Sequence, residues 1–380
     1  MRNNLQEYYA PSDEELNDAW SRGVLTLDAN VLLNAYRYSQ ETRETLLKVL
    51  KKYPGAIWVS YQAALEYQRN RIGVILAQET AYFDLQSALQ KKSNEIESIL
   101  LSYKRHSRID TETISNLLSK ALDNVAHRLK EQATQHPAYS STDPIRERIT
   151  EIFEDCVGDP YSESRLKEIF AEGKLRYEKG IPPGFEDGKK GSESRTYGDL
   201  VMWYQIMDKA EAEKKPCIFV TDDVKEDWWW KVKGRTIGPR PELLKEFRGR
   251  TGQMIHIYQS DRFLEIASQR LLEGVKDESI QEVRAIREAN EADSVKRIRR
   301  PRYTEQDLTT LIELASRYNF APTYRDADEI AKEFNEIRDQ SRDGGSIYMT
   351  IWRIGKGYYD DIESVRTYRQ EIFGFDSDED

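Results

Sequence analysis

Short apolar runs alternate with helix-like stretches along residues 1–272 of the chain. Runs rich in β-branched and aromatic residues predict strands at 24–28, 56–60, 217–221 and 254–258. Between and after them, apolar side chains recur every three or four residues and predict helices at 42–53, 198–214, 242–247 and 261–272. Strands that alternate with helices favour a mostly parallel sheet with right-handed crossovers. We therefore expect an α/β domain whose sheet is flanked by helices.

One interval between predicted strands is too long for a simple crossover. Residues 61–107 contain no proline and a single glycine, and further helices are predicted at 110–135, 143–156 and 163–172. We expect 74–180 to form a helical insertion, a hairpin or small bundle beside the sheet, whose simplest role is structural. The α/β domain then consists of 1–73 and 181–272. A charged helical linker, 273–302, and a small helical domain, 303–380, complete the predicted organisation.

Composition narrows the setting of the protein. Charged residues make up 33% of the chain, and no apolar run is long enough to cross a bilayer or to form a signal peptide. Two widely spaced cysteines favour a reducing compartment, so we expect a soluble cytoplasmic protein without a membrane partner. The four histidines lack metal-ligand spacing, so zinc is not expected. The net charge of −10 does not exclude nucleic acid, because residues 295–302 are strongly basic.

Acidic residues mark strand ends and helix starts. Asp28 ends the first strand, Glu66 lies in the helix after the second, Asp199 opens a helix, and the pair Asp222 and Asp223 ends the third strand. In a doubly wound sheet these positions share one edge, where like charges repel unless a cation neutralises them. Mg²⁺ or Mn²⁺ suits an all-carboxylate site and activates water toward phosphodiesters. Singly, each acid has a simpler interpretation as a helix cap, a surface residue or a turn. Their joint pattern predicts a metal site.

The segments that carry these acids resemble a known family. Residues 27–33, the helix around Glu66, residues 198–200 and residues 220–223 are similar to the four acidic motifs of PIN-domain nucleases. More closely, the chain resembles the bacterial PIN-like subfamily with a long helical insertion, through residues 34–39, 225–229 and 238–243 as well. The resemblance covers about residues 8–270. It implies Mg²⁺- or Mn²⁺-dependent hydrolysis of RNA, or of structured DNA in some branches, and it suits a toxin- or defence-type effector.

The resemblance also implies roles for individual residues. Metal ligands and catalytic residues are Asp28, Glu66, Asp199 and Asp223, with Asp222 as the alternative to its neighbour. Supporting polar residues are Asn30 and Thr221, with Asp227 and Asp187 as weaker candidates in polar loops.

Several basic and aromatic residues are candidates for contact with nucleic acid. Phosphate contacts are expected from Arg69, Arg71, Lys189 and Lys190, for which solvated surface charge is the simpler interpretation. They are also expected from Arg297, Arg299, Arg300 and Arg353, and the basic run favours nucleic acid as the partner of this region. The run Trp228–Trp230 offers rings for base stacking, although three adjacent tryptophans cannot share one face and at least one belongs to the core. The C-terminal helices suit either DNA contact or a protein-interaction or dimerisation bundle.

Two other functions compete with a nuclease. An inactive PIN-like scaffold would bind nucleic acid or a protein partner, but all four acidic positions are retained. A phosphatase-like hydrolase would need a second aspartate two residues after Asp28, where Asn30 stands. Partners other than nucleic acid, a protein or a second copy of the chain, would bind through the insertion or the C-terminal domain.

Overall fold

The computed structural model describes residues 1, 4–135, 139, 142–187, 193–272, 276–299, 303–318, 324–338, 342, 344–355 and 365. The chain divides into two compact units, Met1–Asp293 and Ser294–Asp380. Each unit has apolar clusters of its own.

The first unit is built on a four-stranded parallel sheet. The strands, in the spatial order β2-β1-β3-β6, are Ala56–Trp58, Val24–Leu27, Cys217–Val220 and Ile255–Tyr258. Leu25 of β1 lies opposite Ile57 of β2 and Ile218 of β3. The chain pairs β2 on one side of β1 and later returns to pair β3 on the other. The C-terminal ends of β1 and β3 therefore border the switch point at which open α/β sheets bind their ligands.

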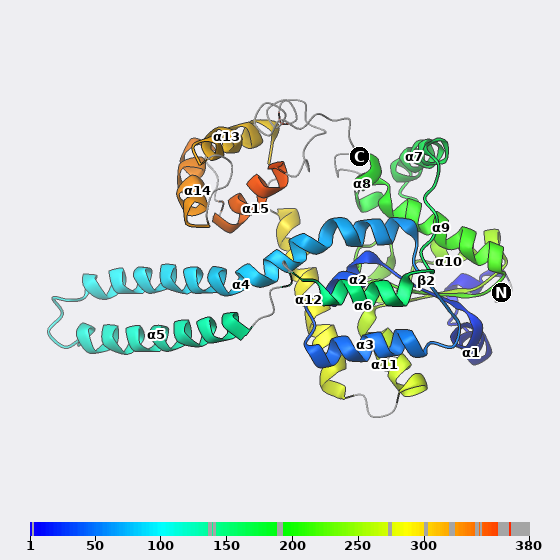
Figure 1. Cartoon of the computed structure of the whole chain (residues 1–380), viewed down its shortest axis with the longest axis horizontal. Helices are drawn as coiled ribbons and strands as arrows, with labels where there is room; N and C mark the ends of the chain where they lie inside the picture. Colours follow the sequence, from blue (N-terminus) through cyan, green and yellow to red (C-terminus); the bar gives the residue numbers. More distant parts are fainter. Residues whose placement is uncertain are drawn as a thin grey trace. The chain divides into compact units, whose positions relative to one another are not determined.

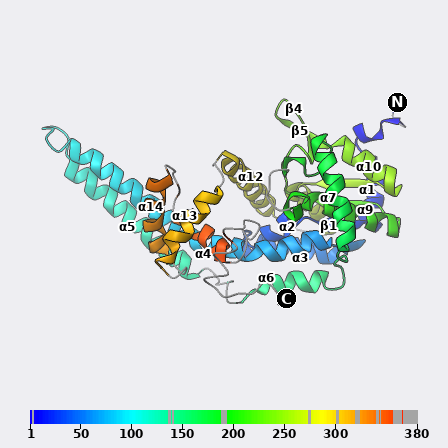
Figure 2. The same ribbon diagram turned by 90° about the horizontal axis from the view of Figure 1, so that it is seen from above.

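Helices cover both faces of this sheet (Figure 1, Figure 2). One face carries α1, α3 and α11, which are Asp13–Arg22, Gln40–Lys52 and Ser260–Leu271. The other carries the start of α4 together with α9 and α10, which are Gly198–Glu213 and Pro241–Thr251. Serine side chains cap the backbone at the starts of α1, α3 and α4, at Ser12, Ser39 and Ser60. The predicted α/β architecture is confirmed.

Six further elements connect these helices and strands. They are η2, Gln6–Tyr8; α2, Ala29–Asn34; α6, Pro144–Phe153; α7, Glu163–Glu178; η3, Phe185–Asp187; and α8, Glu193–Thr196. α2 follows β1 directly, so that the residue between them, Asp28, is its N-cap.

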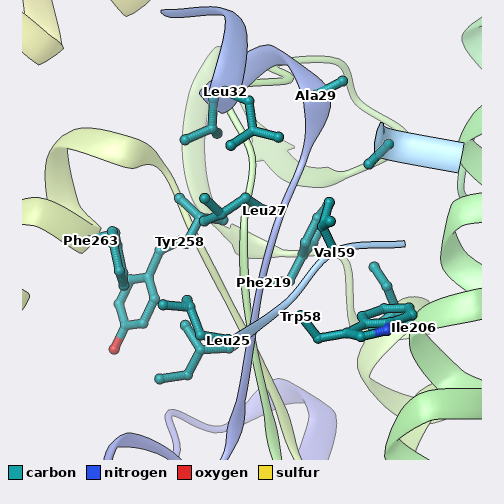
Figure 3. Close-up of a cluster of buried hydrophobic side chains, with 14 of the residues drawn as sticks. Leu25, Leu27, Ala29, Leu32, Trp58, Val59, Ile206, Phe219, Tyr258 and Phe263 are labelled. Atoms are coloured by element: carbon teal, nitrogen blue, oxygen red, sulfur yellow. The ribbon is translucent and has the colours of Figure 1, made fainter. Parts of the chain in front are cut away.

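Apolar side chains pack on both sides of β1 (Figure 3). Leu25 and Phe263 lie on one side, and Phe219 and Ile206 lie on the other. Trp20 stacks on Phe263 with ring centroids 5.5 Å apart. Each fully buried side chain of this size contributes about 1.5–3 kcal/mol, so this two-sided core fixes where the strand ends lie.

A second, two-stranded sheet was not predicted. β4, Trp229–Val232, and β5, Arg235–Pro239, form an antiparallel hairpin. Its turn residues, Lys233 and Gly234, both have positive φ, 51° and 77°, which suits a tight two-residue hairpin turn. The first three residues of β5 are exposed, so the strand has no apolar alternation for a sequence pattern to detect.

The insertion is helical, as predicted, and most of it is one long hairpin. α4, Tyr61–Ser102, is a single helix of 42 residues whose first turns are buried in the core through Ala63, Tyr67, Val74 and Ile75. Beyond these residues it runs antiparallel to α5, Thr111–Gln135, and the pair projects from the sheet (Figure 1, Figure 2). Among the described side chains of this projecting hairpin, Ser93 alone is buried.

The segment expected to be a linker forms α12, Asp277–Arg299. Its first half belongs to the first unit, because Ile280 and Val283 are buried there. Glu282 accepts hydrogen bonds from the hydroxyls of Ser39, at 2.7 Å, and Thr42, at 2.6 Å. These contacts fix the first half of α12 to the start of α3.

The second unit contains three helices within its described residues. They are α13, Glu305–Ser316; α14, Tyr324–Arg338; and α15, Gly344–Gly355. They pack around an apolar cluster that includes Leu311, Phe334 and Ile347. Asp307 is fully buried and forms an ion pair with Arg338 at 2.7 Å. Across all described residues, no helix has the length and hydrophobicity needed to span a membrane.

Candidate active site

Carboxylates from four elements meet at the C-terminal edge of the sheet. Asp28 follows β1, Asp223 follows β3, Glu66 lies in the second turn of α4, and Asp199 lies in the first turn of α9. Their electrostatic coupling shows that they are neighbours, because the charges of the other three all raise the pKa of Asp28. Gly198 brings two of the helices close together, since a Cβ there would lie 2.6 Å from Oε1 of Glu66.

Asp28 has a strongly perturbed pKa. Burial is the largest cause that raises its pKa to about 8, and the neighbouring charges add to it in the order Asp199, Glu66, Asp223. Its Oδ2 accepts hydrogen bonds of 2.6 Å from the Thr221 hydroxyl and the Asn30 amide. These two donors orient a carboxylate that carries its charge at a high cost in free energy.

The adjacent acids after β3 have different surroundings. Asp222 accepts hydrogen bonds from the backbone N–H of Ser260, at 3.0 Å, and from the side chains of Ser260 and Asn34, both at 2.8 Å. It therefore ties β3 to the start of α11. Asp223 instead interacts with Asp28 electrostatically and accepts a 2.8 Å bond from the backbone N–H of Lys225. The geometry thus separates two residues that the sequence left equivalent.

Asp227 is a buried acid at the rim of the same cluster. Its Oδ2 accepts backbone hydrogen bonds from Gly184, at 3.1 Å, and Glu186, at 3.2 Å, while its buried Oδ1 has no hydrogen-bond partner. Burial raises its pKa to about 7, with a further increase from Asp199 and Asp223. Asp227 therefore holds the loop after α7 against the acidic cluster and adds negative charge to it.

A lysine contacts this cluster. The Lys225 ammonium lies 2.7 Å from Oδ2 of Asp223 and 3.7 Å from Oδ2 of Asp199, and its charge lowers the pKa of Asp227. Lys225 lies in the segment 225–229 that resembles the family, but no pattern in the sequence assigned it a role. Its position two residues after a strand-end aspartate was the signal.

Gln62 is a second residue that sequence reasoning missed. Its side chain donates a 2.7 Å hydrogen bond to Oε1 of Glu66, one turn further along α4. Its backbone N–H donates a 3.0 Å bond to Oε1 of Gln205 on α9. The residue therefore fixes both the Glu66 carboxylate and the packing of α4 on α9.

The tryptophan run divides between core and surface. Trp228 and Trp229 are buried, and the Trp229 indole donates a hydrogen bond to the backbone oxygen of Asp223. Trp230 is partly exposed and packs edge-on against Tyr8, with ring centroids 5.8 Å apart. Two of the three rings thus support the site from within the core, and only Trp230 presents a surface for stacking.

Three of the basic candidates, Arg69, Arg71 and Arg353, have described side chains. Arg71 is mostly buried and forms a 2.7 Å ion pair with Asp143, so its charge is used within the fold. Arg69 is exposed one turn after Glu66, and Arg353 is exposed on α15 in the second unit. Outside the described residues or side chains are Asp187, Lys189, Lys190, Arg297, Arg299 and Arg300.

The donor set suits a hard divalent cation in its chemistry. Its candidate ligand atoms are carboxylate oxygens, and the charges that raise the pKa of Asp28 would be offset by added positive charge. As the described side chains stand, no group of three histidine, cysteine or acidic residues converges closely enough to hold a metal ion. Lys225 lies beside two of the acids, so metal binding requires these side chains to rearrange.

A comparison with protein families identifies the family of this chain. A model described as "PIN like domain" matches residues 24–243, from the start of β1 into α10. The chain belongs to the PIN-like domain family. The matched region contains all the carboxylates of the cluster and the projecting hairpin, and it ends before α12 and the second unit. Comparisons with curated proteins and with solved structures gave no match. PIN-like domains are generally nucleases that bind nucleic acid and typically use divalent metals.

Proposed function

We propose that this PIN-like protein is a metal-dependent endonuclease that hydrolyses phosphodiester bonds of nucleic acid. The observation that carries the proposal is the buried Asp28, whose pKa is raised to about 8 by burial and by the charges of three acids on other elements. A fold gains no stability by placing four carboxylates together, and such strained charge clusters are typical of functional sites. The family supports the same conclusion.

In this proposal Asp28, Glu66, Asp199 and Asp223 hold Mg²⁺ or Mn²⁺. Such an ion supplies Lewis-acid activation of a phosphodiester and of the water that attacks it. The protein's contribution is positional: Asn30 and Thr221 orient the Asp28 carboxylate, as expected of supporting residues. We assign Asp222 a structural role, because three donors from α2 and α11 already engage it.

Lys225 has two roles in this proposal. In the metal-free protein its ammonium neutralises Asp223 and Asp199, which limits their mutual repulsion. Its side chain is 29% exposed, so it is able to swing toward solvent when a divalent cation takes its place. There the ammonium would bind a phosphate of the substrate.

The finer assignments rest on the family resemblance and on composition. We favour RNA over DNA as substrate, and a toxin- or defence-type role. The two cysteines are unpaired, as expected in the cytoplasm. We propose that the second unit binds nucleic acid, with Arg353 exposed on α15 as the described contact. The basic run before it lies outside the described side chains.

A cleavage assay with matched variants tests the nuclease proposal. Purified protein is incubated with labelled RNA, single-stranded DNA and duplex DNA, with Mn²⁺, Mg²⁺ or EDTA. We expect metal-dependent cutting that Asp28→Asn and Asp223→Asn each reduce by at least about 100-fold. Glu14→Gln, an exposed acid on α1, is the control and keeps full activity.

Binding without metal-dependent cutting of any of these substrates would instead favour an inactive scaffold. Cutting that survives both aspartate substitutions would place the chemistry elsewhere. Cutting that Asp222→Asn reduces as strongly as Asp223→Asn does, in a protein of unchanged stability, would contradict the assignment of the metal ligand after β3.

A further inference from the structure

The projecting hairpin of α4 and α5 has an unusually apolar surface for a segment without a core. Ten of the 21 large hydrophobic side chains that are exposed among the described residues lie between positions 83 and 125. The two helices contact each other along a seam of partly buried residues that includes Leu89, Leu118 and Leu122. This seam leaves most of the apolar surface of the hairpin in water.

The exposed apolar residues of α5 form a regular stripe. Residues spaced three and four apart lie on one side of a helix. The stripe starts at the helix cap and comprises Asp110, Ile114, Leu117, Ala121, Val125 and Arg128. It is rotated by about a quarter turn from the seam, at 100° per residue. It therefore lies on one side of the hairpin and does not face α4.

α4 carries a matching stripe on the same face of the hairpin. Its members are Leu85, Ala88, Lys92, Ile96, Ile99 and Tyr103. It too is rotated by about a quarter turn from the seam, and in the same sense along its own chain. Because the two helices run in opposite directions, equal rotations bring both stripes to one side. We call these twelve positions the hairpin face.

The hairpin face is complementary to itself. When α5 packs antiparallel on its own copy about position 119, Asp110 meets Arg128, Ile114 meets Val125, and Leu117 meets Ala121. Each pair joins opposite charges, or large residues with smaller ones, and each occurs twice by symmetry.

The stripe on α4 has the same two-fold pattern about position 94. There Leu85 meets Tyr103 of the other copy, and Ala88 meets its Ile99. The methylene stem of Lys92 would cover apolar surface of the other copy, while its ammonium pairs with Glu95 of its own helix at 2.7 Å. Positions 94 and 119 lie at one height on the hairpin, each about a dozen residues from the middle of the turn. A single two-fold axis therefore relates both α4 and α5 to their copies.

We propose that the hairpin face binds a second copy of this chain, and that the two hairpins form an antiparallel four-helix bundle in which the tip of each lies beside the base of the other. Seven large apolar side chains of the face are 39–64% exposed, and together they offer a surface on the order of the ~800 Å² that each partner buries in a standard interface. The bundle gives each hairpin the core that it lacks alone.

The oligomeric state of the full-length chain tests this interface. By sedimentation or light scattering, the wild type is expected to be a dimer at about 10 μM. Leu117→Asp should raise the dissociation constant at least about 100-fold, because the symmetric interface would bury two unpaired charges. Leu117 is 64% exposed in the single chain, so the substitution leaves the fold of each copy intact.

Leu101→Asp is the matched control. Leu101 is on the same hairpin and is 65% exposed, but it lies on the face opposite the stripe. This variant should remain dimeric, and circular dichroism should show equal helix content in both variants. A monomeric wild type at 100 μM overturns the proposal. So does dissociation by both substitutions or by neither.

Disulfide cross-linking tests the antiparallel register. Chains carrying Leu117→Cys, mixed with chains carrying Ala121→Cys, should form a mixed dimer under mild oxidation, and the unmutated chain gives the background from the native cysteines. Leu117→Cys mixed with Ile96→Cys should cross-link weakly. If the second mixture is linked instead of the first, the hairpins pack in parallel and the antiparallel bundle is wrong.

Discussion

Replacing Asp28 by its neutral isostere should make the metal-free protein more stable. Asp28→Asn removes one negative charge while keeping a side-chain oxygen that accepts from the Thr221 hydroxyl and the Asn30 amide. The pKa of Asp28 rises from 3.8 in the unfolded chain to about 8 in the fold. At about 1.4 kcal/mol per unit, ionised Asp28 costs at most about 5 kcal/mol near pH 8. We expect a gain of about 2–3 kcal/mol, because the surrounding side chains relax.

The sign of the pH dependence follows from the raised pKa. The folded protein binds the Asp28 proton more tightly than the unfolded chain, so the contribution of this group to stability rises as the pH falls from about 8 toward 4. The variant lacks this dependence. Its advantage over the wild type should therefore be largest at pH 8 and should nearly vanish at pH 4–5.

Urea unfolding followed by tryptophan fluorescence, in EDTA at pH 8 and pH 5, measures both effects. Adding Mg²⁺ should stabilise the wild type more than the variant, because a ligand that binds only the folded state raises its stability. Asp18→Asn, which removes an exposed acid from α1, is the control for a general charge effect. An Asp28→Asn variant that is no more stable than the wild type at pH 8 in EDTA would refute the electrostatic reasoning.

Three further results are expected. Lys225→Met should tighten Mn²⁺ binding by about tenfold in calorimetry, because it removes a competing positive charge, whereas the control Lys245→Met on α10 should not. Unchanged or weaker binding by Lys225→Met would contradict the role of Lys225. Burial lowers the pKa of His256 to about 4, so the free energy of unfolding of the wild type, measured in urea, should fall by about 2 kcal/mol more than that of His256→Gln between pH 7 and pH 4. Parallel pH profiles of the two proteins would contradict a buried neutral His256. Phe334→Ala should destabilise the second unit by about 3–5 kcal/mol and leave the calorimetric unfolding transition of the first unit unchanged. A shift of both transitions would show that the two units unfold together.

Local patterns were sufficient to predict the main sheet. Apolar runs and helical spacing depend on near neighbours along the chain, and the four parallel strands follow from them. The edge on which the strand-end acids meet follows from the strand order. The β4–β5 hairpin was missed because the exposed residues of β5, polar and apolar alike, do not alternate with buried ones, and because its turn lacks the usual asparagine or aspartate before Gly234.

Contacts between distant residues account for what the sequence could not resolve. Asp222 and Asp223 are adjacent, and their partners distinguish them: Ser260 and Asn34 bind Asp222, whereas Lys225 binds Asp223. Arg71 has the composition of a phosphate contact, yet Asp143 pairs with it from 72 residues away. The first half of α12 looked like a solvated linker because its charges are spread around the helix, and its packing depends on partners on α3.

The Glu66 carboxylate and the first arm of the projecting hairpin belong to one uninterrupted helix, α4. Glu66 lies about 14 Å on one side of the point near Ile75 where the helix leaves the core, and the end of α4 at Ser102 lies about 40 Å on the other side, at 1.5 Å per residue. A rigid rocking of the helix that displaces the tip by about 3 Å would shift the carboxylate by about 1 Å, enough to change a catalytic rate by about 100-fold. We therefore expect a partner that holds the far end of the hairpin to influence the position of the Glu66 carboxylate at the sheet edge.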